Sequence, residues 1–297
     1  MKTHTVVFTL FFFSRMIAQN TSPDLMAMLD SVEKKDNKKE YVTATFKNSH
    51  LINQQTTEVV GKNSLDFRIQ HRFGDVQTGA YNAWGIDGPA NIRLGLDYSY
   101  DGRLMIGIGR SSDQKMVDGY LKYKILRQTT KGGSMPITLV FVTTMFYTNQ
   151  IVPSTNGFDA YPYLSDRFSY FNELIIGRKF SEKFSFQIAP TYLHYNIVQN
   201  ITDKNDVWAI SFATRYKLGK RFSLMAEGSF TLNKYSATQY YNESGIGWEI
   251  ETGGHVFQMF FTNSSGIVEN QYISQTTSTW ANWGFKLGFN ISRVFTL

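Results

Sequence analysis

The chain has 297 residues and a formal net charge of +6, with 42% hydrophobic and 15% aromatic residues and no cysteine. The lack of cysteine excludes disulfides, thiolate metal sites and a cysteine nucleophile. After the N-terminus, no stretch approaches the roughly 20 apolar residues of a membrane helix, so a helical membrane protein is excluded. A strand-built membrane protein stays open, because its alternating pattern is weak in each segment. The positive charge is scattered rather than gathered into a patch, so no nucleic-acid partner is predicted.

Residues 1–18 have the features of a secretory signal peptide. An apolar stretch runs from Val6 to Phe13, and the sequence MIAQN offers cleavage after Ala18. Residues 19–62 then form a separate segment. It begins with Ser22 and Pro23, which are typical of a helix start, and continues with a charged run that is typical of a solvated linker. We expect this N-terminal segment to be short and helical or extended, and to lie in the periplasm or plug a barrel.

From residue 63 to residue 297, apolar and polar residues alternate persistently. In NIRLGLDY, for example, Ile92, Leu94 and Leu96 share one face, and small or polar residues occupy the other. A period of two predicts strands, and many of these runs have about the 9–11 residues of a tilted membrane strand. The twelve predicted strands span 63–73, 90–99, 103–110, 117–127, 136–148, 168–179, 183–197, 206–218, 221–232, 245–252, 255–263 and 279–292.

The connections between these strands largely alternate in length. Tight turns such as YDGR, SEK, GK and GG are interspersed with long polar loops, although 111–116 is short and 128–135 is long for its position. Outer-membrane barrels have this asymmetry, with short periplasmic turns and longer external loops. The fold prediction is therefore all-β: an antiparallel, up-and-down transmembrane β-barrel of about twelve strands, in the outer membrane of a Gram-negative bacterium.

Six stretches carry a resemblance to a known family. They are ATFKNSHLIN at 44–53, LDFRIQHRFG at 65–74, NIRLGLDYSYDGRLMIGIGRSS at 91–112, DGYLKYKILRQ at 118–128, HVFQMFFTNS at 255–264 and WGFKLGFNISRVF at 283–295. Together they resemble an uncharacterised family of Gram-negative outer-membrane β-barrels, which is classed as a domain of unknown function. The resemblance implies a barrel in the outer membrane. It implies no established activity, ligand or site.

The strand phase places acids and bases of the first strands on the inner wall. This lumen charge cluster comprises Asp66, Arg68, Arg72, Arg93, Asp97, Asp118, Lys122 and Lys124. Two interpretations stay open: a salt-bridge network that fills a narrow lumen, since buried charges must be paired, or a charged constriction that selects solutes. Twelve strands give an intermediate width, so a narrow or plugged pore is expected. Inward glycines such as Gly95 and Gly109 either admit another segment or permit strand coiling.

No catalytic residue, metal site or cofactor is predicted. The histidines of the mature chain are far apart, and Ser49 and His50, the adjacent serine–histidine pair, precede the predicted barrel. The leading hypothesis is a narrow channel or transport barrel for small polar solutes. The alternative is a closed barrel that acts as a structural or interaction partner in an envelope assembly, and a barrel-embedded hydrolase ranks third. The expected partners are outer-membrane lipid, the barrel assembly machinery and envelope proteins.

Overall fold

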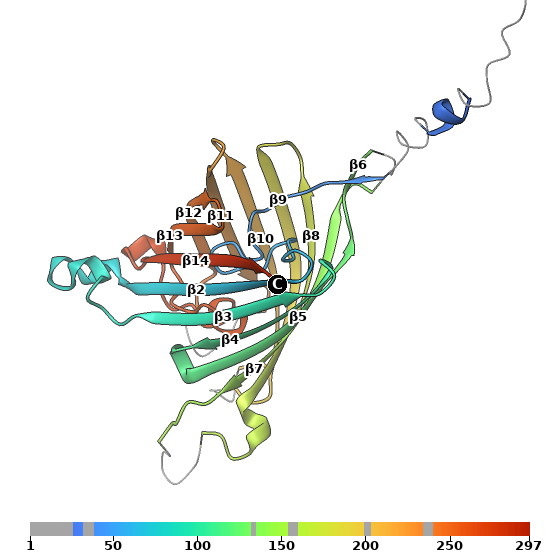
Figure 1. Cartoon of the computed structure of the whole chain (residues 1–297). Coiled ribbons are helices and arrows are strands. Elements are labelled where there is room, and N and C mark those ends of the chain that lie inside the picture. Colours follow the sequence, from blue (N-terminus) through green and yellow to red (C-terminus); the bar gives the residue numbers. More distant parts are fainter. Residues whose placement is uncertain (1–25, 32–38, 132–134, 154–159, 199–202, 234–239) are drawn as a thin grey trace, which may run out of the picture.

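The computed structural model describes residues 26–31, 39–131, 135–153, 160–198, 203–233 and 240–297, so the predicted signal peptide lies outside the described residues. Within these residues, twelve antiparallel strands of 8 to 12 residues form one closed barrel, in which β14 pairs with β2 (Figure 1). The strands are β2 (Ser64–Asp75), β3 (Asn91–Ser99), β4 (Leu104–Ser111), β5 (Met116–Leu126), β7 (Thr138–Thr148), β8 (Phe168–Lys179), β9 (Phe184–Tyr195), β10 (Asp206–Lys217), β11 (Phe222–Thr231), β12 (Glu243–Thr252), β13 (His255–Thr262) and β14 (Lys286–Thr296).

The prediction of a twelve-stranded barrel is confirmed, and the largest error lies at the start of the last strand. This strand was expected at 279–292, but β14 begins at Lys286. Before it, Trp280–Asn282 form a single 3-10 turn and Trp283 has a φ of 56°, so the chain turns where the alternation suggested an extended strand. The phase is nevertheless right, because Gly288, Asn290 and Ser292 face the interior.

The outer surface of the barrel is apolar, and the inner surface is largely polar. On β3 and β4, Ile92, Leu94, Leu96, Ile106 and Ile108 are all at least 40% exposed. A belt of exposed aliphatic side chains around a closed barrel matches the hydrocarbon of a bilayer. Among the described residues, no helix is both long and apolar enough to cross a membrane.

The two ends of the barrel differ in their connections. The ends of the last and first strands meet where the Leu297 amide donates to the Asn63 carbonyl over 2.8 Å, and the tight turns at 100–103, 180–183, 218–221 and 253–254 lie at this end. A small extra sheet of β1 (Glu40–Tyr41) and β6 (Thr129–Lys131) also stands here. The opposite end carries long connections such as 76–90 and 263–285. We refer to these ends as periplasmic and external, following the loop asymmetry of outer-membrane barrels.

Candidate functional site

The lumen contains the chain segment between β1 and β2, residues 42–60, which we call the insert. Figure 1 shows this segment in blue, running inside the ring of strands. Every residue from Thr45 to Thr57 except Lys47 is buried. Within the described part of the chain, the insert has one β-bridge, between its own His50 and Gln55, and it contributes nothing to the barrel ladder. The strand β1 ends at Tyr41, so the chain from residue 42 to residue 49 is extended or bent without a strand partner.

Charged side chains of the wall pair with each other beside the insert. The Arg68 guanidinium lies 2.6 Å from Asp66 Oδ2 and 3.0 Å from Asp97 Oδ2, and all three side chains are at most 1% exposed. Arg93 makes a bidentate pair with Asp118, with Nε 2.9 Å from Oδ1 and a terminal nitrogen 2.5 Å from Oδ2. These contacts satisfy charges that would be costly to bury alone.

Other wall residues bind the backbone of the insert directly. Donors from the wall reach its carbonyl groups: Arg72 and Asn290 donate to Ile52 O, Lys122 to Ser49 O, Gln258 to His50 O and Gln187 to Gln55 O, over 2.7 to 3.1 Å. In the opposite sense, the Glu227 carboxylate accepts from the amides of Asn53 and Gln54 over 2.8 and 3.2 Å. The wall therefore supplies the hydrogen bonds that a strand ladder would otherwise make.

All eight residues of the lumen charge cluster face the interior, but they do not form one group. Asp66, Arg68 and Asp97 make one network, Arg93 and Asp118 a second, and Arg72 and Lys122 bind the insert. Lys124 lies near the periplasmic end, 3.5 Å from Glu58 of the insert. Their role in selecting solutes stays a prediction.

The later strands were predicted, but the residues on them that hold the insert were not. These are Gln187, Glu227, Glu243, Gln258 and Asn290. Two signals pointed to them: their inward phase, and the apolar inner residue Phe260, which packs with Phe46, Leu51 and Ile52 of the insert.

The inward glycines accommodate large neighbours. A Cβ at Gly95 or Gly109 would overlap the Arg93 side chain, and one at Gly288 would overlap the Phe260 ring, so these three make room for wall side chains. Gly177 and Gly245, which were not singled out from the sequence, admit the insert itself: an added Cβ there would meet Thr57 and Ile52. Gly284 precedes β14 and lies against Thr279.

A second segment fills the lumen from the external end. Residues 263–279, which we call the folded-in loop, contain the short helix α2 (Glu269–Tyr272), and all residues from Gly266 to Ser274 are buried. Val268, Tyr272 and Ile273 pack in an apolar cluster with inward side chains of β5, β7, β8, β9 and β10. The two segments meet where Gln55 Nε2 donates to Glu269 Oε1 over 3.3 Å. The lumen is thus occupied from both ends.

Burial shifts the acid–base properties of both segments. Burial and the neighbouring Arg68 cation lower the pKa of His50 well below its usual value, so the imidazole is neutral and can accept a hydrogen bond from Arg68. Burial raises the pKa of Glu269 to about 7, with Asp118 adding to the rise and Arg93 opposing it. The insert therefore carries a neutral imidazole, and the folded-in loop carries a carboxyl group that loses its proton near pH 7.

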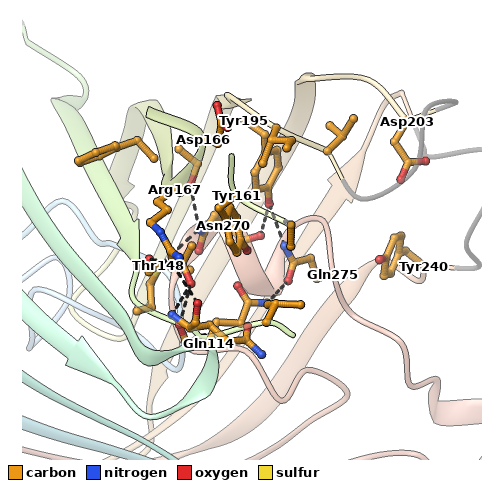
Figure 2. A pocket seen from close by; sticks show the side chains of 18 residues that line it. Gln114, Thr148, Tyr161, Asp166, Arg167, Tyr195, Asp203, Tyr240, Asn270 and Gln275 are labelled. Carbon is orange, nitrogen blue, oxygen red and sulfur yellow. Dashed lines mark hydrogen bonds between the residues drawn. The ribbon is translucent and has the colours of Figure 1, made fainter. Parts of the chain in front are cut away.

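A cavity of about 540 Å³ opens at the external end, beside the folded-in loop (Figure 2). Asn270 and Gln275 of the folded-in loop form part of its wall, together with Tyr195 of β9 and Gln114. Gln114 Nε2 donates to Gln275 Oε1 over 2.6 Å, and Asn270 Nδ2 donates to Ser169 Oγ over 3.0 Å. The Arg167 guanidinium lies over the Tyr161 ring, 4.7 Å from its centroid, and both residues are part of the lining.

The geometry does not support hydrolytic chemistry at Ser49 and His50. Ser49 Oγ lies 3.4 Å from His50 Nδ1, but both residues are buried against Arg68. Elsewhere on the wall, the Glu249 and Glu251 carboxylates bind Arg215 over 2.9 and 2.6 Å.

The sequence matches the model of a family described as a membrane-bound beta barrel domain (DUF5777) over residues 46–295. The chain belongs to this family. The match begins inside the insert, so the family includes the lumen-filling segment as well as the strands. The chain is an outer-membrane β-barrel protein.

Several solved structures share the fold at low similarity. The NanC porin is 11% identical with a TM-score of 0.48, covering 78% of this chain and 99% of that one. The KdgM porin is 9% identical with a TM-score of 0.43, covering 79% and 99%. The COG4313 outer membrane channel from Pseudomonas putida F1 is 14% identical with a TM-score of 0.42, covering 80% and 98%. Such distant likenesses carry no argument about function. No curated protein matches the sequence.

Proposed function

We propose that this protein is a narrow channel for small polar solutes, and that the insert and the folded-in loop close it in the conformation described here. Conduction requires that the lumen empties and that water replaces the two segments. The observation that carries the proposal is the way the insert is held. It lies against the wall without joining the barrel ladder, so it can leave while every strand pairing stays intact.

The wall contacts of the insert are suited to exchange with water. Several are hydrogen bonds from Arg, Lys, Gln and Asn side chains to backbone carbonyls of the insert. Water can take over such bonds, and the net cost is about 0.5–1.5 kcal/mol for each Gln or Asn donor and about 1.5–3 kcal/mol for each Arg or Lys donor. The ion pairs of Arg68 and Arg93 join wall residues to each other, so they persist when the insert leaves. An emptied lumen would then be a polar pore with both signs of charge on its wall.

Ion conductance in planar bilayers tests the proposal with four forms of the refolded protein. These are the full mature chain, a deletion of residues 19–60, a chain whose residues 266–275 are replaced by a short Gly-Ser linker, and the combination. We expect steady conductance in the combined form and lower or intermittent conductance in the single forms. A combined form that folds, as judged by a heat-modifiable gel shift, but stays silent would rule out the channel.

A reversible lock separates release of the insert from damage caused by deletion. An ideal Cβ at Gly177 lies 3.6 Å from Thr57 Cβ, which suits a disulfide, and the chain has no other cysteine. In the linker form with Thr57→Cys and Gly177→Cys, oxidation should close the pore and reduction should reopen it. The two single-cysteine variants are the controls and should not respond to oxidant.

The second candidate is a closed barrel that serves as an interaction partner in an envelope assembly. The filling of the lumen from both ends favours it, since a closed barrel needs no path for solutes. Silence of all four forms in the bilayer would support this candidate. Ser49 and His50 are buried against Arg68, so we propose no hydrolytic role for them.

A further inference from the structure

We propose that the external cavity beside the folded-in loop is a binding site for a neutral saccharide. The cavity lies at the external mouth, and its volume of about 540 Å³ is within the range of small-molecule sites. Binding does not require that the barrel conducts. Only the further step, that the bound saccharide is the solute that passes, rests on the proposed function.

The hydrogen-bonding groups of the cavity suit hydroxyl groups. Gln114, Gln150, Asn270 and Gln275 contribute amides, each of which can both donate and accept, as a sugar hydroxyl does. Asn270 is 1% exposed and its Nδ2 is used by Ser169, whereas its Oδ1 has no hydrogen-bond partner among the described residues. A buried acceptor without a partner costs free energy, and because Asn270 lines the cavity, a turn of its side chain would let a ligand hydroxyl satisfy it.

Aromatic side chains give the cavity the second feature of a saccharide site. Tyr161, Phe168, Tyr195 and Tyr240 are all part of its lining. The C–H face of a sugar ring packs on an aromatic face, whose π electrons are the negative end of the ring quadrupole. Tyr161 is held in place by the guanidinium of Arg167, which is itself anchored by bonds to the carbonyls of Thr148 and Gln150 over 3.2 and 2.9 Å. Figure 2 labels Tyr161, Arg167 and Asn270 among the side chains that line the cavity.

The charge of the lining favours a neutral ligand over an anionic one. Among the described residues that line the cavity, Arg167 is the one cation. The lining also contains two acids, Asp166 and Asp203. An acidic sugar would therefore find one lining cation for its carboxylate, with the acid Asp166 adjacent to that cation in the sequence. A purely apolar ligand would leave the amides without partners, which is unfavourable in a confined site.

Saccharide binding is tested with the full mature chain in a zwitterionic detergent, because a maltoside detergent would compete for the site. The probes are maltose, cellobiose and lactose, with glucuronate as the acidic comparison, and binding is followed by saturation-transfer NMR and calorimetry. We expect at least one disaccharide to bind with a Kd of roughly millimolar or below, and glucuronate to bind more weakly. Absence of any disaccharide signal at about 50 mM, far above a millimolar Kd, would overturn the proposal, as would tighter binding of glucuronate.

Two tyrosine variants assign the signal to this cavity. Tyr161→Ala removes an aromatic face and should weaken disaccharide binding by about tenfold, the equivalent of a strong aromatic contact. Tyr81→Ala, at a position that is 95% exposed on another external loop, should leave binding unchanged. Equal binding by the Tyr161→Ala variant and the parent chain would contradict the assignment.

A bilayer experiment then separates this inference from the channel proposal. This experiment uses the form that lacks residues 19–60 but keeps the folded-in loop. If this form conducts, the disaccharide that binds should reduce its ion current. The Tyr161→Ala variant of the same form should show no such reduction. Block that persists in Tyr161→Ala would count against the cavity as the saccharide site. If no form conducts, the channel proposal fails, while the calorimetric result still decides whether the cavity binds a saccharide.

Discussion

The insert and the folded-in loop fill the same lumen by different physical means. The insert is bound largely through directional hydrogen bonds from wall side chains, including Arg72, Lys122 and Glu227. The folded-in loop is anchored by apolar contacts of Val268, Tyr272 and Ile273. Water can replace the hydrogen bonds of the insert when it leaves the wall. Removal of the folded-in loop instead exposes apolar surface, which costs about 25 cal/mol of free energy per Å². The two segments should therefore respond differently to the loss of a polar wall contact and to the loss of an apolar one.

The difference has a limit, because the insert also buries Phe46, Leu51 and Ile52 against Phe260 and its neighbours. The insert is therefore held by apolar contacts at these three residues and by polar contacts along its backbone. The folded-in loop is joined to the insert by the hydrogen bond that Gln55 Nε2 donates to Glu269 Oε1. Variants that affect one kind of contact at a time separate the two segments.

Removal of the cation at Arg68 should have the largest effect on stability. Arg68→Met leaves the carboxylates of Asp66 and Asp97 buried and unpaired, which costs about 3–5 kcal/mol in the free energy of unfolding. Urea unfolding in lipid vesicles, followed by tryptophan fluorescence, measures the change. Arg221→Met, at an exposed turn position, is the control and should have little effect. A loss of stability at Arg68 no larger than at Arg221 would show that the network contributes nothing.

Truncation of the apolar anchor should release the folded-in loop alone. Ile273 is 1% exposed in the apolar cluster, so Ile273→Ala should destabilise loop docking by about 2–5 kcal/mol. Limited proteolysis from the external side should then cut residues 263–279, while the insert stays protected. Ile151→Ala, at a position 90% exposed, is the matched control. Simultaneous release of the insert would mean that the two segments are a single unit.

Loss of one wall donor should loosen the insert and spare the loop. Gln187 Nε2 donates to Gln55 O over 2.7 Å, and the Gln187 Oε1 has no partner among the described residues, so Gln187→Leu removes this bond and no other. The unsatisfied carbonyl costs about 1–3 kcal/mol. Hydrogen exchange of the insert amides should accelerate, and that of residues 266–274 should not. The exposed Gln77→Leu is the control, and equal exchange in both variants would contradict the role of the wall donors.

The strands could be predicted from the sequence because their pattern is local. The predicted strand at 168–179 coincides with β8, since a period of two needs only neighbouring residues to be visible. At Trp280–Trp283 the same alternation was misleading, because a tight turn with a positive φ at Trp283 has no signature in hydrophobicity.

The inward direction of the charge cluster also followed from the strand phase, but its partners did not. Arg68 pairs with Asp97, and Gln55 contacts Gln187 more than a hundred residues along the chain. The first contact depends on the register of β2 against β3, which the long connection 76–90 does not reveal, and the second depends on the path of the insert. The closed lumen is therefore a property of the three-dimensional structure, although the apolar inward Phe260 already marked a place on the wall where something apolar had to pack.

The smallest predicted effect concerns pH and the bond between the two segments. Burial raises the pKa of Glu269 to about 7, from 4.5 in an exposed chain, so the docked loop holds a proton that the undocked loop releases. The stabilisation from this proton is complete below pH 4.5 and is lost as the pH rises through 7. Between pH 6 and pH 8, the docking free energy should fall by about 1.3 kcal/mol, or roughly tenfold in the docking equilibrium.

Proteolytic cleavage of residues 263–279 as a function of pH measures this change. Cleavage should become faster from pH 6 to pH 8 in the parent chain, after correction with an unstructured peptide substrate for the pH dependence of the protease. Glu269→Gln keeps the shape of the side chain without the ionisation, so its cleavage should not depend on pH. A pH dependence that survives in Glu269→Gln would assign the proton to another group. Docking that strengthens as the pH rises would reverse the sign derived from burial, and would mean that the carboxylate is charged and paired within the lumen.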